Sequence, residues 1–184
     1  MRFIILSVVW SIVLFSCAGK TEQVKAKYVF YFIGDGMGVN QVIGTEMYLA
    51  ELEGRIGTKS LSFTSFPVRN YVTTYSGTNA VTCSAAAGTA LATGTKTQNG
   101  RIGMRQDSSF LYSIAWRAKQ AGKAVGVTTS VAINHATPAV FYAHQPDRQM
   151  YYEIGTDAAK AGFDFYGGAG WKQVFSPHDS SEID

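Results

Sequence analysis

An apolar run that ends at a glycine-rich turn and leads into an amphipathic segment constrains the fold of this chain most. Residues 28–33, YVFYFI, are continuously apolar, β-branched or aromatic, which is typical of a strand buried on both faces of a parallel sheet. The run stops at GDGMG, and an amphipathic stretch follows over about residues 40–53. Strand, glycine turn and helix in this order predict an α/β fold.

The same order of segments recurs along the rest of the chain. Further strands are predicted at residues 70–76, 124–130 and 163–168. Further helices are predicted in the alanine-rich segment after residue 83, over 110–120 with Gly122 ending it, from TPAVFYAH with Pro138 at its first position, and over 150–162. In open α/β sheets the ligand site lies beyond the carboxyl ends of the strands. The polar residues of loops 34–38, 77–84 and 131–138 are therefore expected to converge.

The composition supports one packed domain and offers no sign of a nucleic-acid partner. Of the 184 residues, 46% are hydrophobic and 16% are charged, which allows a core and excludes wholesale disorder. The net charge is only +3, and no cluster of lysine and arginine stands out.

The first residues predict an export signal. Arg2 precedes an uncharged run over residues 3–15, which is shorter than the roughly 20 residues of a membrane-spanning helix and fits the apolar part of a secretory signal. The run ends in LFSCAGK, which resembles a lipobox with Cys17 as the lipidated mature N-terminus; cleavage nearby without a lipid is the alternative. We expect residues 1–16 to be a lipoprotein signal peptide and 17–27 a polar tether. The protein would then lie in the periplasm or at the outer membrane of a Gram-negative bacterium, held by a lipid anchor.

Two glycine-rich stretches look like nucleotide-binding loops but do not match them. GDGMGV has Val39 where the dinucleotide fingerprint needs a glycine, and GTALATGTKT has one residue too many between Gly88 and Gly94 for a phosphate loop. What remains is Asp35, a carboxylate between two glycines at the end of a predicted strand. Such an oxygen ligand suits a hard or borderline cation. The alternative is that Asp35 only makes a turn or caps the following helix.

Ser84 lies where a polar loop meets the alanine-rich helix. The N-terminus of a helix presents free N–H groups and the positive end of the dipole, which stabilise a phosphate. A metal ion nearby could lower the pKa of the hydroxyl and make it a nucleophile without a histidine base. The alternative is a serine that caps a buried helix.

Three motifs occur in one order and at a spacing that resembles the alkaline phosphatases. They are VFYFIGDGMG, TCSAAAGTALATGTKTQNGRIG and NHATPAVFYAHQPDR, and the resemblance covers about residues 28–170. It implies a three-layer α/β fold with a mainly parallel central sheet. It also implies metal-dependent hydrolysis of phosphate monoesters with two zinc ions and one magnesium ion.

The resemblance implies roles for four residues. Asp35 is similar to the aspartate that ligates a zinc and a magnesium ion together, and Thr137 to the hydroxyl that ligates magnesium. Ser84 is similar to the nucleophile that is phosphorylated in turnover and contacts zinc. Arg148 is similar to the arginine that holds the phosphate through a planar, bidentate fork. The implied mechanism has two in-line steps, in which Ser84 attacks first and metal-bound hydroxide then attacks the phosphoserine.

Two residues beside these depart from the family pattern or vary within it. Cys83 stands where many members have an aspartate that orients the arginine, so the hold on Arg148 is expected to be looser. His135 stands where members carry aspartate or histidine, and it is expected to act beside the metals, favouring zinc over magnesium at the third site or binding through water.

The remaining metal ligands of the family lie well beyond the end of this chain. Residues 28–184 are therefore interpreted as the N-terminal part of a longer catalytic domain, with an incomplete fold and little or no activity as it stands. Members of the family are often dimeric, so a full-length homodimer is compatible with the resemblance. Two rival functions stay open: a phosphodiesterase or sulfatase-like member of the same superfamily, and a non-catalytic phosphate-binding lipoprotein.

Overall fold

The computed structural model describes residues 26–175 and divides the chain into two units, Met1–Ile33 and Gly34–Asp184. Residues 1–25, with the predicted signal peptide, Cys17 and most of the tether, lie outside the described part, so export and lipidation stay predictions. None of the helices within 26–175 is long and apolar enough to cross a membrane.

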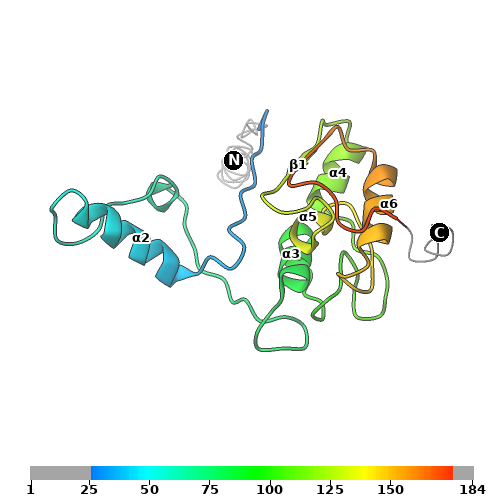
Figure 1. Ribbon diagram of the computed structural model, residues 1–184, viewed down its shortest axis with the longest axis horizontal. Coiled ribbons are helices and arrows are strands. Elements are labelled where there is room, and N and C mark those ends of the chain that lie inside the picture. The colour runs from blue at the N-terminus through cyan, green and yellow to red at the C-terminus, as the bar shows by residue number, and fades with distance from the viewer. Residues whose placement is uncertain (1–25, 176–184) are drawn as a thin grey trace, which may run out of the picture. The chain divides into compact units, whose positions relative to one another are not determined.

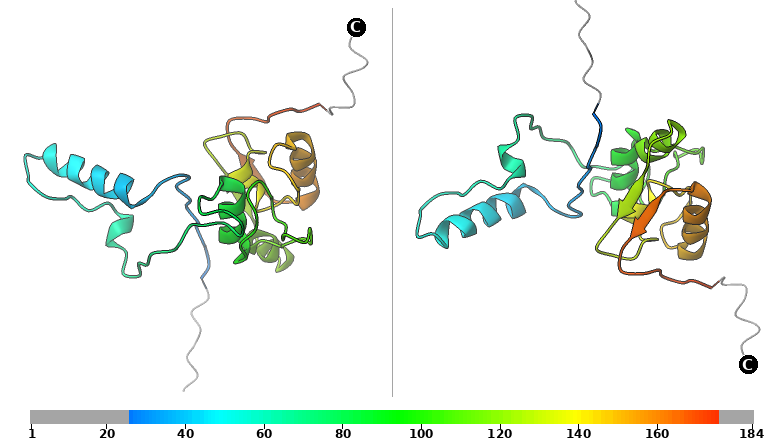
Figure 2. Two further views of the ribbon diagram at one scale, coloured as in Figure 1. Left: turned by 90° about the horizontal axis from the view of Figure 1, so that it is seen from below. Right: turned by 90° about the horizontal axis from the view of Figure 1, so that it is seen from above.

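The second unit contains all the described helices and strands (Figure 1). In chain order they are α2 (Val39–Glu51), the 3₁₀ helix η1 (Phe63–Ser65), α3 (Ser84–Thr93), α4 (Ile114–Gln120), β1 (Gly126–Thr128), α5 (Ala136–Ala139), α6 (Tyr151–Ala161) and β2 (Phe165–Gly167). Strands β1 and β2 pair in parallel, with Val127 opposite Tyr166. Figure 2 shows this strand pair between α3 and α6, which confirms the α/β class.

The helices largely follow the predicted pattern, with local capping setting their bounds. Helix α4 begins at Ile114, later than predicted, because the Ser113 hydroxyl accepts the N–H of Trp116 (3.0 Å) and donates to the carbonyl of Phe141 (2.5 Å). Helix α3 ends at Thr93 with Gly94 as its C-cap residue, whose φ of 76° is the left-handed conformation that glycine adopts without strain.

Two predicted strands are absent from the described residues. Residues 28–33 and 70–76 form no strand, and side chains such as Phe32 and Tyr71 are 89% and 83% exposed. The prediction was wrong there because an apolar run becomes a strand only when a neighbouring strand takes its backbone hydrogen bonds. The one sheet found within residues 26–175 contains only β1 and β2.

The core of the second unit lies around β1, α3, α5 and α6. Its buried members include Ala85, Ala92, Val127, Ile133, Ala136, Val140, Ile154 and Ala158. Small residues let α3 approach α5 closely: a Cβ atom added at Gly88 would lie 3.0 Å from Cγ2 and 3.2 Å from Cγ1 of Val140, which is itself 1% exposed.

We expect Gly88→Val to destabilise the full-length protein by about 1–3 kcal/mol, because its branched side chain has no room beside the buried Val140. The midpoint of urea unfolding measures the effect. Ala90→Val in the same helix, at a half-buried position, controls for the lower helix propensity of valine. Equal midpoints for the two variants would show that the Gly88–Val140 contact is not limiting.

Candidate active site

Asp35 sits at the tip of a tight turn before α2. The N–H of Met37 donates to the carbonyl of Gly34 (3.2 Å), and Gly36 has a φ of 71°, which favours glycine. Helix α2 then starts after Gly38, whose N–H donates to the side chain of Gln41 (3.0 Å). The turn leaves the Asp35 carboxylate exposed at the protein surface.

Ser84 is the first residue of α3, and Cys83 is its N-cap residue. The alternative prediction that Ser84 caps the helix is therefore wrong. Cys83 has the extended backbone of an N-cap, with φ of −106° and ψ of 166°, and this turns the chain into the helix at Ser84. The Ser84 hydroxyl therefore makes no capping bond and lies in the first turn, where the N–H groups have no partner within the helix.

Thr137 lies in the first turn of α5, which has His135 as its N-cap residue. Pro138 was predicted to be the first residue of this helix, but it is the third. The shift costs no hydrogen bond, since the N–H groups of the first turn have no partner within the helix.

The three predicted loops converge on the Asp35 carboxylate. The Ser84 hydroxyl donates to Oδ1 of Asp35 (3.2 Å), and the Thr137 hydroxyl donates to Oδ2 (2.7 Å). These bonds span 49 and 102 residues of sequence. One carboxylate and two hydroxyls from separate loops therefore share a single site.

His135 borders this site in a crowded and mainly positive environment. Burial, the charge of Arg148 and the charge of Lys172 lower the pKa of its imidazole, while Asp35 acts in the opposite direction. The ring stacks on Tyr151, with centroids 6.4 Å apart. Its Nδ1 atom is buried without a hydrogen-bond partner among residues 26–175. An imidazole nitrogen without a proton or a partner is able to bind a metal.

Arg148 follows α5 in a loop and acts on both Cys83 and His135 through its charge. Burial alone would raise the pKa of the Cys83 thiol, but backbone N–H groups of Ala86 and Gly100, together with Arg148, give a net lowering. No carboxylate of residues 26–175 makes an ion pair with Arg148. Its charge therefore acts on the residue before Ser84 and on His135, and no carboxylate of the described residues forms an ion pair with it.

The oxygen-rich part of the site fits a hard cation. A carboxylate and two hydroxyls are ligands that Mg²⁺ accepts, and the Asp35 oxygens already draw both hydroxyls toward one point. The described residues do not complete a zinc centre, because within 26–175 no group of three or more His, Cys, Asp and Glu side chains could hold a metal ion. Further ligands for two zinc ions would have to come from elsewhere.

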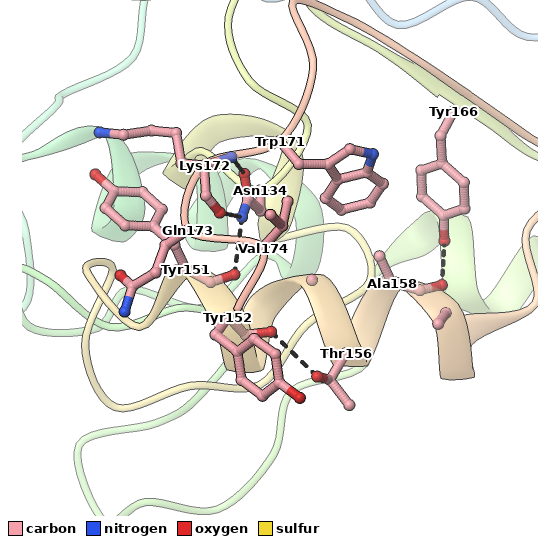
Figure 3. Close-up of a pocket in the computed structure, with 12 residues that line it drawn as sticks. Asn134, Tyr151, Tyr152, Thr156, Ala158, Tyr166, Trp171, Lys172, Gln173 and Val174 are labelled. Carbon is pink, nitrogen blue, oxygen red and sulfur yellow. Dashed lines mark hydrogen bonds between the residues drawn. The ribbon is translucent and has the colours of Figure 1, made fainter. Parts of the chain in front are cut away.

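A cavity beside His135 was not predicted from the sequence (Figure 3). Its volume is about 420 Å³, and Tyr151, Tyr166 and Trp171 line it. The buried Asn134 holds its floor by donating to the carbonyls of Tyr151 (2.8 Å) and Lys172 (2.6 Å), and it accepts the N–H of Lys172 (2.9 Å). The one sign of this network is that the Asn134 side chain is buried. The burial of a loop residue cannot be predicted from the sequence, so the network was missed.

Comparison with known proteins places these residues in a family. The profile of the alkaline phosphatase family matches residues 26–166. The alkaline phosphatase of Gadus morhua is 34% identical over 152 residues, covering 75% of this chain and 32% of that protein. Alkaline phosphatase 4 of Drosophila melanogaster is 35% identical over 150 residues, covering 77% of this chain and 25% of that protein.

Solved structures agree with the sequence comparison. The alkaline phosphatase of the Antarctic bacterium TAB5 superposes with a TM-score of 0.65 at 34% identity, covering 73% of this chain and 37% of that one. The chain spans about a third or less of the length of the Gadus morhua and Drosophila melanogaster relatives. The match to the family profile over most of its residues shows that the chain belongs to the alkaline phosphatase family.

Proposed function

We propose that the full-length protein hydrolyses phosphate monoesters through a phosphoserine intermediate at Ser84. The observation that carries the proposal is the pair of hydrogen bonds that join Ser84 and Thr137 to the two oxygens of Asp35, in a chain of the alkaline phosphatase family. A nucleophile at a helix N-terminus, an acidic metal ligand and a nearby arginine are the parts that phosphoryl transfer needs.

The serine oxygen reacts twice. In the first step Ser84 Oγ forms a bond to phosphorus while the bond from phosphorus to the leaving alkoxide or aryloxide breaks. In the second step the oxygen of a water molecule attacks phosphorus and the bond from phosphorus to Ser84 Oγ breaks. One proton of the water restores the Ser84 hydroxyl, and inorganic phosphate leaves. The hydroxyl proton of Ser84 is directed at Asp35 Oδ1, which would accept it as Oγ attacks, and the leaving alkoxide or aryloxide would take up a proton from solvent.

Arg148 binds the phosphoryl group in this proposal. Its guanidinium offers two parallel N–H donors to two phosphoryl oxygens, and the N–H groups at the start of α3 add to the positive potential. A monoester presents a dianionic terminal phosphate, which such a fork holds better than the monoanion of a diester.

Metal ions complete the proposed site. TAB5 alkaline phosphatase mutants with glutamate or aspartate in place of one histidine hold Mg in the site called M3. In this chain Asp35 and Thr137 would hold a magnesium ion, and Asp35 and Ser84 would contribute to two zinc ions. When bound, the ions neutralise charge and lower the pKa of an attacking hydroxyl. Because residues 26–175 offer no three-ligand group, we expect little or no activity from the 184-residue chain alone.

The proposal predicts that the purified full-length protein hydrolyses p-nitrophenyl phosphate far faster than bis-p-nitrophenyl phosphate or p-nitrophenyl sulfate. A chelator should abolish the activity, and zinc with magnesium should restore it. Faster cleavage of the diester or the sulfate would instead indicate a phosphodiesterase or sulfatase. Phosphate binding without hydrolysis of any of the three would indicate a non-catalytic binding protein.

His135 gives a separate prediction about metal preference. We expect His135→Asp to raise the affinity for Mg²⁺ by about 10-fold, because a carboxylate oxygen suits this hard ion better than an imidazole. Metal content after dialysis against buffered magnesium measures the effect. Asn70→Asp adds the same charge at an exposed position outside the site and serves as the control. An equal gain in both variants would attribute the change to net charge.

A further inference from the structure

The turn at residues 97–100, which follows α3 in the sequence, forms hydrogen bonds with the backbone that leads into Ser84. The side chain of Asn99 donates from Nδ2 to the carbonyl of Val81 (3.0 Å) and accepts the N–H of Cys83 at Oδ1 (3.1 Å). Asparagine can do both because its amide carries a donor and an acceptor side by side. It therefore pairs with the chain on both sides of residue 82, as a neighbouring strand would.

Gly100 adds a third contact to the same residue. Its N–H donates to Sγ of Cys83 (3.1 Å). The φ of Gly100 is 91°, a backbone conformation that residues other than glycine rarely adopt. The Asn-Gly pair thus holds both the backbone and the side chain of Cys83, the residue that caps α3.

The loop is also tied at its other end. The N–H of Gly77 donates to the carbonyl of Thr97 (2.7 Å), and a Cβ atom at Gly77 would lie 3.0 Å from that carbonyl oxygen. Loop 77–83 is therefore fixed at its start and at its end by one short turn. The segment that follows the turn is anchored to α3, since Thr89 Oγ1 accepts the N–H of Gly103 (3.1 Å).

We propose that Asn99 is a positioning residue, which sets the direction of the Ser84 hydroxyl by fixing the backbone of Cys83. The N-cap residue determines where the first helical residue points, and the Ser84 Oγ distance of 3.2 Å to Asp35 depends on it. A small displacement of an attacking atom costs catalysis more than it costs substrate binding. This inference rests on the proposed role of Ser84 as the nucleophile.

The first test compares kinetics of full-length Asn99 variants with p-nitrophenyl phosphate. We expect Asn99→Ala to lower kcat by about 10- to 100-fold with KM changed by less than about threefold. Asn99→Asp keeps the acceptor for the N–H of Cys83 and loses only the donor to Val81, so it should recover part of kcat. The side chain of Gln98 makes no hydrogen bond within residues 26–175, so Gln98→Ala should match the wild-type kcat and KM.

The second test is amide hydrogen exchange followed by mass spectrometry on the same variants without substrate. In Asn99→Ala, exchange should become faster in the peptide that covers residues 80–84 and stay unchanged in α6. Wild-type kcat in Asn99→Ala would overturn the inference, and so would a loss of kcat with unchanged exchange at 80–84. If Asn99→Ala does not fold, Asn99→Asp is the variant that tests the inference. A wild-type kcat in Asn99→Asp, together with faster exchange in the peptide that covers residues 80–84, would also overturn it.

Failure of the inference is distinguishable from failure of the proposed function. If Ser84→Ala is inactive and Asn99→Ala is fully active, the nucleophile stands and the positioning role falls. If Ser84→Ala retains wild-type activity, the proposed function itself is wrong.

Discussion

Replacement of Ser84 by alanine is expected to lower the hydrolysis of p-nitrophenyl phosphate by the full-length protein by about 10⁴-fold or more. The substitution removes the oxygen that would form the bond to phosphorus, and no other hydroxyl at the site is in a position to replace it, since Thr137 donates to the opposite oxygen of Asp35. Initial rates at saturating substrate give the ratio of kcat values directly.

Folding must be separated from chemistry in this experiment. Ser84 begins α3 but does not cap it, so its hydroxyl makes no capping hydrogen bond that stabilises the helix. The midpoint of urea unfolding should therefore change little in Ser84→Ala. Ser60→Ala, at an exposed position, is the matched control and should leave kcat unchanged.

A second readout identifies the intermediate. Brief incubation with substrate at acidic pH, followed by proteolysis and mass spectrometry, should find phosphate on the wild-type peptide that contains Ser84. The variant should carry none. Activity of Ser84→Ala equal to that of Ser60→Ala would remove this serine from the mechanism.

The positions brought together at the site could be predicted from the sequence because they follow glycines and helix starts. Asp35 stands between glycines, and Ser84 and Thr137 stand at the first turns of α3 and α5, where short-range signals are strong. The hydrogen bonds between them join loops that the sequence pattern had placed at one edge of the sheet.

The strands were harder to predict than the loops. Residues 124–130 and 163–168 were predicted as strands, and β1 and β2 form within them because each supplies the other with hydrogen bonds. Residues 28–33 have an equally apolar pattern but form no strand. Periodicity reports which faces could be buried, and it carries no information about whether a pairing partner is available.

Asn99 shows a different limit of sequence reasoning. The Asn-Gly pair at residues 99 and 100 is a plain turn signal, and the turn is present. Which backbone groups the amide meets depends on how α3 returns the chain toward residue 83, through the left-handed Gly94. The path of the chain depends on how the whole structure packs, so the hydrogen-bond partners of Asn99 could not be predicted from the residues around it.

The second large effect is expected from Asp35→Asn, which should lower kcat/KM by about 10³-fold and reduce the metal content of the dialysed protein. The amide keeps the size of the side chain and can still accept one hydroxyl hydrogen bond. It loses the negative charge that would hold a cation. It also loses one of the two acceptor oxygens, so that Ser84 and Thr137 can no longer donate to separate oxygens of the same side chain.

The control for Asp35→Asn is Asp107→Asn, which removes the same charge from another exposed carboxylate. Asp107 also accepts two hydrogen bonds, from the N–H (2.9 Å) and the hydroxyl (2.7 Å) of Ser109, but both end on its Oδ1. Asp107→Asn therefore controls for the lost charge, and the single oxygen of its amide can still accept both bonds. Only Asp35 joins side chains that lie 49 and 102 residues away. If metal content and kcat/KM fall in Asp35→Asn and stay at wild-type values in Asp107→Asn, the loss belongs to the site where the three loops meet. If metal content stays at the wild-type value while kcat/KM falls, Asp35 acts by orienting Ser84 alone, and the metal must be held by other residues.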